Sequence, residues 1–145
     1  MGLPGITREQ MVEVDRIMVN ELGISVELMM EHAGLNLARL AAQLMNQKQA
    51  KVWVVAGSGN NGGGGLVAAR RLVGWGHDVT VVLPKGALGL RSIPLAQLRR
   101  LEGLGVDITE SFQTMSETKD SMILDAYSGY GLLASSSVSL IPTTT

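Results

Sequence analysis

The chain has 145 residues, of which 46% are hydrophobic and 17% charged, and its formal net charge is −1. This composition predicts one globular domain and disfavours nucleic acid or a membrane surface as a partner, because both usually need a basic face. The absence of cysteine excludes disulfides and thiolate chemistry and agrees with a cytoplasmic location. The N-terminus has no secretory pattern, and no apolar run approaches the ~20 residues that span a bilayer.

Two helices are predicted at the start of the chain. Residues 7–10, TREQ, form a capping box, and apolar residues follow at helical spacing until Gly23, which has the character of a C′ glycine. Ser25 is placed to cap a second helix, whose apolar stripe extends from Leu28 to Leu44.

Strands and helices are predicted to alternate along the rest of the chain. Short apolar runs indicate buried strands at residues 51–56, 78–83 and 121–125 and a weaker strand at 105–108. Helices are predicted between them, at residues 66–75 and 92–104. This order implies right-handed βαβ crossovers. The expected fold class is α/β: a Rossmann-like three-layer αβα sandwich with a mainly parallel sheet, incomplete at the C-terminus. Residues 134–145 are Ser/Thr-rich and uncharged, which predicts an irregular tail.

A glycine-rich segment follows the first strand. Residues 57–65, GSGNNGGGG, match the pattern G-x-G-x-x-G between a predicted strand and a predicted helix. Glycine lets a backbone approach a ligand closely, and free N–H groups at a helix start face anions, so the segment predicts a phosphate or nucleotide site. The alternative is that these glycines serve only close strand–helix packing.

Two strand ends carry charged residues that bear on function. The second strand ends at Leu83-Pro84-Lys85, where a dinucleotide-binding domain would place an acid for the ribose, so an ordinary NAD-dependent dehydrogenase is disfavoured. Lys85 would suit a phosphate, although a solvated surface lysine is the simpler interpretation. Asp125 ends the last strand and is predicted either to meet a cation or to cap the following turn.

Three separated segments resemble the NAD(P)H-hydrate epimerases, the family of the YjeF N-terminal domain. Residues 56–70, AGSGNNGGGGLVAAR, are similar to its signature, the helices over residues 7–34 to its opening, and residues 125–132 to a later segment. The matches occur in the family's order. They predict a partial YjeF N-terminal-like domain over residues 1–133.

The resemblance implies an activity and a set of site residues. The activity is interconversion of the R and S epimers of hydrated NADH and NADPH, damaged cofactors that a partner dehydratase then repairs. The residues implied to bind the hydrated dinucleotide are Asn60, Asn61, Gly62, Gly63, Gly64, Gly129, Tyr130, Gly131 and Leu132. Asn61 and Asp125 are implied to converge on a potassium ion, and the chain to form a homodimer through its N-terminal helices. Replacing Gly62 by Val is then expected to abolish nucleotide binding and leave the fold intact.

Two departures from the family pattern qualify these expectations. Gly64 stands where the family commonly has Asp, and the family's later Asp and Ser have no counterpart in the 145 residues. Epimerisation needs a proton-transfer group within ~3 Å of its target, and no catalytic residue is assigned here. We therefore expect the 145-residue chain by itself to lack turnover. The alternatives are a non-catalytic nucleotide-binding or protein-interaction module and an inactive truncated copy.

Overall fold

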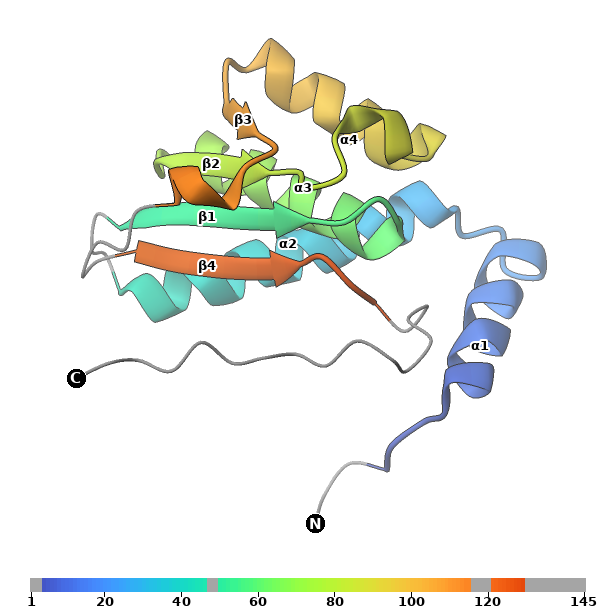
Figure 1. The fold of residues 1–145 in the computed structure, drawn as a ribbon. Coiled ribbons are helices and arrows are strands. Elements are labelled where there is room, and N and C mark those ends of the chain that lie inside the picture. Colours follow the sequence, from blue (N-terminus) through green and yellow to red (C-terminus); the bar gives the residue numbers. More distant parts are fainter. Residues whose placement is uncertain (1–3, 47–49, 116–120, 130–145) are drawn as a thin grey trace.

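The computed structural model describes residues 4–46, 50–115 and 121–129 and arranges them around a parallel sheet (Figure 1). The elements in chain order are α1 (Arg8–Asn20), α2 (Val26–Met45), β1 (Lys51–Ala56), α3 (Asn60–Gly74), β2 (Val79–Val82), η1 (Ala87–Gly89), α4 (Ser92–Gly103), β3 (Asp107–Thr109), η2 (Phe112–Thr114) and β4 (Ser121–Ala126). Both predicted caps are confirmed: Thr7 and Gln10 form the capping box of α1, and Ser25 caps α2. The predicted tail and domain boundary lie outside the described residues.

The sheet has the strand order β3-β2-β1-β4, and all its pairs are parallel. The chain moves outward from β1 through β2 to β3 and then returns to the other side of β1 to form β4. The direction of winding therefore reverses between β1 and β4, where Val55 pairs with Asp125. In open α/β sheets, ligands bind beyond the carboxyl ends of the strands at such a reversal.

The main core lies between the sheet and helices α2, α3 and α4. Alternate residues of β1, namely Val52, Val54 and Ala56, are almost fully buried against these helices. The opposite face of β1 carries a smaller cluster in which Trp53 and Val55 join Val82, with Met115 packed against them. The parallel α/β architecture is confirmed. Among the described residues, the helices that build this core cover one face of the sheet.

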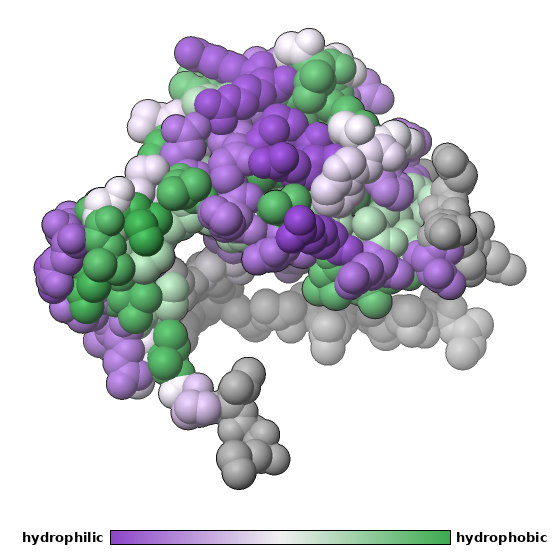
Figure 2. All heavy atoms as spheres, turned by 180° about the vertical axis from the view of Figure 1, so that it is seen from behind, coloured by the Kyte–Doolittle hydropathy of each residue, from purple (hydrophilic) through white to green (hydrophobic). Residues whose placement is uncertain are grey.

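Helix α1 stands apart from this core (Figure 1). None of its residues is buried, although Val12, Val14 and Val19 are apolar and exposed, as is Leu22 just beyond its end. Hydrophobic surface is visible over this helix in the view from behind (Figure 2). In the part of the chain that the structure describes, no helix has the length and apolar character needed to cross a bilayer.

Candidate functional site

The glycine-rich segment divides into a short turn and the start of a helix. Gly57 to Gly59 connect β1 to α3, and α3 begins at Asn60, six residues before the predicted start at Leu66. Gly62 to Gly65 therefore lie inside the helix and are buried. Glycine costs about 1 kcal/mol relative to alanine in a helix interior, so tertiary packing must supply the reason for four in succession.

The turn itself packs backbone against backbone. A Cβ atom on Gly57 would lie 1.9 Å from the carbonyl oxygen of Tyr127, which follows β4. A Cβ atom on Gly62 would lie 1.9 Å from the carbonyl oxygen of Gly57. Real Cβ atoms do not approach oxygen this closely, so both positions need glycine. The Gly57 N–H also donates to the carbonyl of Ala126 at 3.2 Å, which joins the turn to β4.

Two further glycines of α3 allow close packing with other elements. A Cβ atom on Gly63 would lie 2.5 Å from Sδ of Met30 on α2, and one on Gly65 would lie 2.5 Å from Cβ of Ala126 on β4. At Gly64, by contrast, a Cβ atom would meet nothing within 4 Å. The acidic residue that the family commonly has at this position would therefore find room for its Cβ atom here.

These contacts correct one expectation from the sequence. Val in place of Gly62 was expected to block a ligand and leave the fold intact, but the added Cβ atom would collide with Gly57 before any ligand is considered. Close packing is a role of Gly62, Gly63 and Gly65 in this structure. This role is compatible with a ligand site, because the packing fixes the start of α3 at the carboxyl end of β1.

The start of α3 offers backbone donors to an anion. Its N-cap is Gly59, which has no side chain to satisfy the first N–H groups. The first of the helical hydrogen bonds runs from the Gly63 N–H to the Gly59 carbonyl at 3.0 Å. The three preceding N–H groups have no partner within the helix, and the helix dipole adds a partial positive charge there. Asn60 and Asn61 are exposed at this point.

Asn61 connects this helix start to the segment after β4. Its side-chain amide donates to the Ser128 carbonyl at 2.6 Å, and a Cβ atom on Gly129 would lie 3.1 Å from Cβ of Asn61. Residues from two separate parts of the predicted dinucleotide site, Asn61 and Gly129, are thus brought together at one edge of the sheet. The predicted site residues Tyr130, Gly131 and Leu132 lie outside the described residues.

Asp125 is the penultimate residue of β4, at the same edge of the sheet, and is exposed. Its Oδ1 atom accepts a hydrogen bond from the Tyr127 N–H at 3.0 Å, so the predicted capping role is present. The carboxylate has a second oxygen, and the side-chain oxygen of Asn61 is not used by the bond to Ser128. Carboxylate and amide oxygens are the donors that hard cations prefer. No group of three or more acidic, His or Cys side chains suited to a metal occurs among the described residues, so any cation here would also need neutral oxygen ligands.

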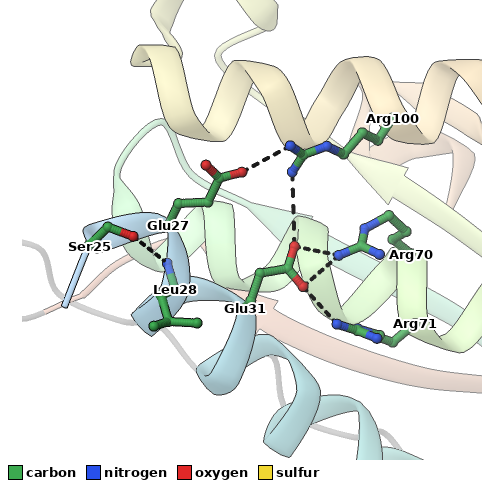
Figure 3. Close-up of a pocket in the computed structure, with 7 residues that line it drawn as sticks. All are labelled: Ser25, Glu27, Leu28, Glu31, Arg70, Arg71 and Arg100. Carbon is green, nitrogen blue, oxygen red and sulfur yellow. Dashed lines mark hydrogen bonds and ion pairs between the residues drawn. The ribbon is translucent and has the colours of Figure 1, made fainter.

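A second polar feature lies among helices α2, α3 and α4. Glu31 of α2 accepts hydrogen bonds from Arg70 at 2.6 Å and Arg71 at 2.9 Å, both on α3. Arg100 of α4 pairs with Glu27 at 2.9 Å. Figure 3 shows these side chains converging around an open pocket from three different helices. Because its arginines already face carboxylates, this ion-pair cluster holds α2 against α3 and α4.

Glu31 is the centre of this cluster. Gln97, which is fully buried on α4, also donates to it at 3.2 Å. Partial burial acts to raise the pKa of Glu31, but the hydrogen bonds from Arg71 and Arg70 outweigh burial and hold the pKa below its ordinary value of 4.5. Glu31 is therefore charged at neutral pH. It fixes the α2–α3 contact in which Gly34 lies against the Gly64 carbonyl; a Cβ atom on Gly34 would be 2.6 Å from that oxygen.

Comparison with known proteins identifies what this arrangement is similar to. The family model described as YjeF-related protein N-terminus matches residues 26–142. An NAD(P)H-hydrate epimerase from Dehalogenimonas lykanthroporepellens is 39% identical over 91% of this chain and 54% of its own length. One from Elusimicrobium minutum is 35% identical over 84% of this chain and 56% of its own length. The chain thus spans about half the length of these curated relatives.

The matches also include longer proteins and one solved structure. A bifunctional NAD(P)H-hydrate repair enzyme from Thermofilum pendens is 37% identical over 82% of this chain, which corresponds to 24% of that enzyme. The crystal structure of yeast ynu0 superposes with a TM-score of 0.80 at 24% identity, covering 94% of this chain and 61% of the yeast chain. The structural match supports the fold alone.

Proposed function

The chain belongs to the family of YjeF-related protein N-terminal domains, and on this premise we propose that it acts in the interconversion of R and S epimers of hydrated NADH and NADPH. Such hydrates are damaged cofactors, and epimerisation would present them in the form that a dehydratase repairs. The enzymes named NAD(P)H-hydrate epimerase that match most of this chain support the proposal.

The observation that carries the proposal is the junction between the start of α3 and the end of β4. The Asn61 amide bonds the Ser128 carbonyl, which places the glycine-rich helix start beside the segment that leads to Gly129. A dinucleotide with its phosphates at the helix start would lie across the winding reversal of the sheet. The side chains and backbone of residues 60–64 and 129–132 would bind it there.

A potassium ion is proposed at the same edge, held by Asn61 and Asp125. Their oxygens are of the type that hard cations take, and both residues lie at the carboxyl edge of the sheet. When bound, the ion would supply a fixed positive charge beside the anionic ligand. With Asp125 committed to a cation and to the Tyr127 N–H, its carboxylate is better suited to positioning the ligand than to carrying a proton.

The test uses separated hydrate epimers. Each pure epimer of NADPH hydrate is incubated with the protein and potassium, and its conversion is followed by chromatography. The proposed activity predicts that both reach the same mixture faster than they do spontaneously. The departures from the family pattern predict no turnover by the 145 residues alone, and this assay decides between the two. An Asn61→Ala variant should bind about tenfold more weakly, as expected for loss of one hydrogen bond at the junction, whereas the exposed Asn36→Ala control on α2 should not. Binding without interconversion would instead support a non-catalytic nucleotide-binding module.

A homodimer and a cytoplasmic location complete the proposal. Helix α1 exposes Val12 and Val14 at 50% and 44% and buries none of its residues, and a second copy of the chain would cover such a face. Sedimentation should show a dimer that a Val12→Glu variant dissociates and an Asn20→Glu control preserves. The lack of cysteine suits the cytoplasm, which cell fractionation would test.

A further inference from the structure

Lys85 follows β2 and lies near the glycine-rich turn. Gly89, in the loop after β2, lies close to both Lys85 and the glycine-rich turn. A Cβ atom on Gly89 would lie 3.6 Å from Cβ of Ser58, inside the turn, and 4.0 Å from Cβ of Lys85. The loop after β2 therefore rests against the turn and brings Lys85 with it.

The ammonium group of Lys85 reaches across the end of β1. Its Nζ atom lies 5.7 Å from the centroid of the Tyr127 ring, and Tyr127 follows β4. In the sheet, β1 lies between β2 and β4. A contact between side chains that follow β2 and β4 must therefore pass over the carboxyl end of β1, where the Gly57–Gly59 turn begins. The aromatic ring holds the cation there by a cation–π interaction.

The charge of Lys85 is not neutralised by a neighbouring carboxylate. Within residues 4–46, 50–115 and 121–129, its ammonium has no acidic group at ion-pair distance, in contrast to Lys51, which pairs with Asp78 at 2.6 Å. Two acidic residues lie on the neighbouring segments: Glu110, whose Oε1 atom lies 2.7 Å from the place of a Cβ atom on Gly86, and Asp125, which accepts from the Tyr127 N–H. A lysine ammonium at an exposed site over a glycine turn is suited to a phosphate oxygen.

We propose that the Lys85 ammonium moves from the Tyr127 ring to bind a phosphate group of the dinucleotide. This inference rests on the proposed function and adds a residue that determines affinity, and through it substrate preference. The phosphate is either the pyrophosphate shared by both hydrates or the 2′-phosphate that only NADPH hydrate carries. In ordinary dinucleotide-binding domains, the end of the second strand is where the ribose end of the ligand is recognised.

The experiment measures binding of NADH hydrate and NADPH hydrate to the chain and its variants by calorimetry. Lys85→Ala should weaken binding by about 5- to 20-fold, the range for one charge-assisted contact at an exposed position, and Lys85→Arg should retain most of the affinity. The loss should shrink at high salt, because exposed charges are screened. Equal loss for both ligands assigns the pyrophosphate, and loss confined to NADPH hydrate assigns the 2′-phosphate.

The matched control is Lys51→Ala. Lys51 also places its ammonium over an aromatic ring, 5.4 Å from the centroid of Trp53, but it stands at the start of β1, at the opposite edge of the sheet. Its replacement should leave both affinities unchanged. Wild-type affinities in Lys85→Ala, with binding otherwise intact, would overturn the role of Lys85 alone. No binding of either hydrate to the unmodified protein would overturn the proposed function together with it.

Discussion

The two halves of α3 hold the same helix in place by opposite means. The first half, Gly62 to Gly65, has no side chains, and its backbone packs directly against α2, β4 and the turn. The second half projects Arg70 and Arg71 to the Glu31 carboxylate of α2. The glycine half fixes position through close approach and is intolerant of added atoms at Gly62 and Gly65. The arginine half fixes position through charge and is sensitive to pH.

The largest effect is expected from Val at Gly62. The added Cβ atom would lie 1.9 Å from the Gly57 carbonyl oxygen. The atoms that it meets are all backbone atoms of Gly57, so no flexible side chain can move away. We expect loss of about 3 kcal/mol or more, or failure to fold. Urea unfolding and soluble yield would measure this. A variant of normal stability that has lost only dinucleotide binding would instead support a purely ligand-facing role for Gly62.

Gly65→Ala should lower the free energy of unfolding by less than Gly62→Val does. A second substitution should restore part of that loss. The Cβ atom added at Gly65 would lie 2.5 Å from Cβ of Ala126, which predicts a cost of about 1–3 kcal/mol. Removing the opposing methyl group by Ala126→Gly should recover part of the loss in the double variant. The coupling in this double-mutant cycle is the measured quantity, and additive costs would show that the two positions do not meet.

Glu31→Gln probes the arginine half. It leaves Arg70 and Arg71 facing a neutral amide, with an expected cost of about 1–2 kcal/mol at pH 7. Since the pKa of Glu31 is lowered by folding, the charged carboxylate stabilises the fold above its ordinary pKa near 4.5 and loses this effect as the pH falls through the folded value. Melting curves from pH 7 to pH 3 should converge for the two proteins. A gap that stays constant with pH would exclude the charge as its cause.

Gly64→Ala is the matched control for the glycine half and has the smallest expected effect, of opposite sign. A Cβ atom there meets nothing within 4 Å, and alanine is about 0.5–1 kcal/mol better than glycine inside a helix. A rise in the melting temperature is expected. Destabilisation comparable to that of Gly65→Ala would mean that all the glycines of α3 are equally crowded.

The sequence by itself determined the features that depend on neighbouring residues. Thr7 and Ser25 specify helix starts because their side chains bond N–H groups three residues away. The apolar runs specify strands, and the carboxyl ends of parallel strands lie at one edge of the sheet, which places Asn61 and Asp125 there whatever the strand order. The family resemblance came from the same local strings.

Only the tertiary structure decided where α3 begins and what its glycines do. Local propensity opposes a helix through Gly62–Gly65. The helix forms there because Gly62, Gly63 and Gly65 pack closely against the turn, α2 and β4, which leaves little room for a Cβ atom at these three positions. The same holds for Lys85, which lies 42 residues before Tyr127 in the chain. The two meet only because β2 and β4 flank β1 and end at the same edge of the sheet. Contacts between distant segments depend on strand order, and no spacing within a single segment encodes that order.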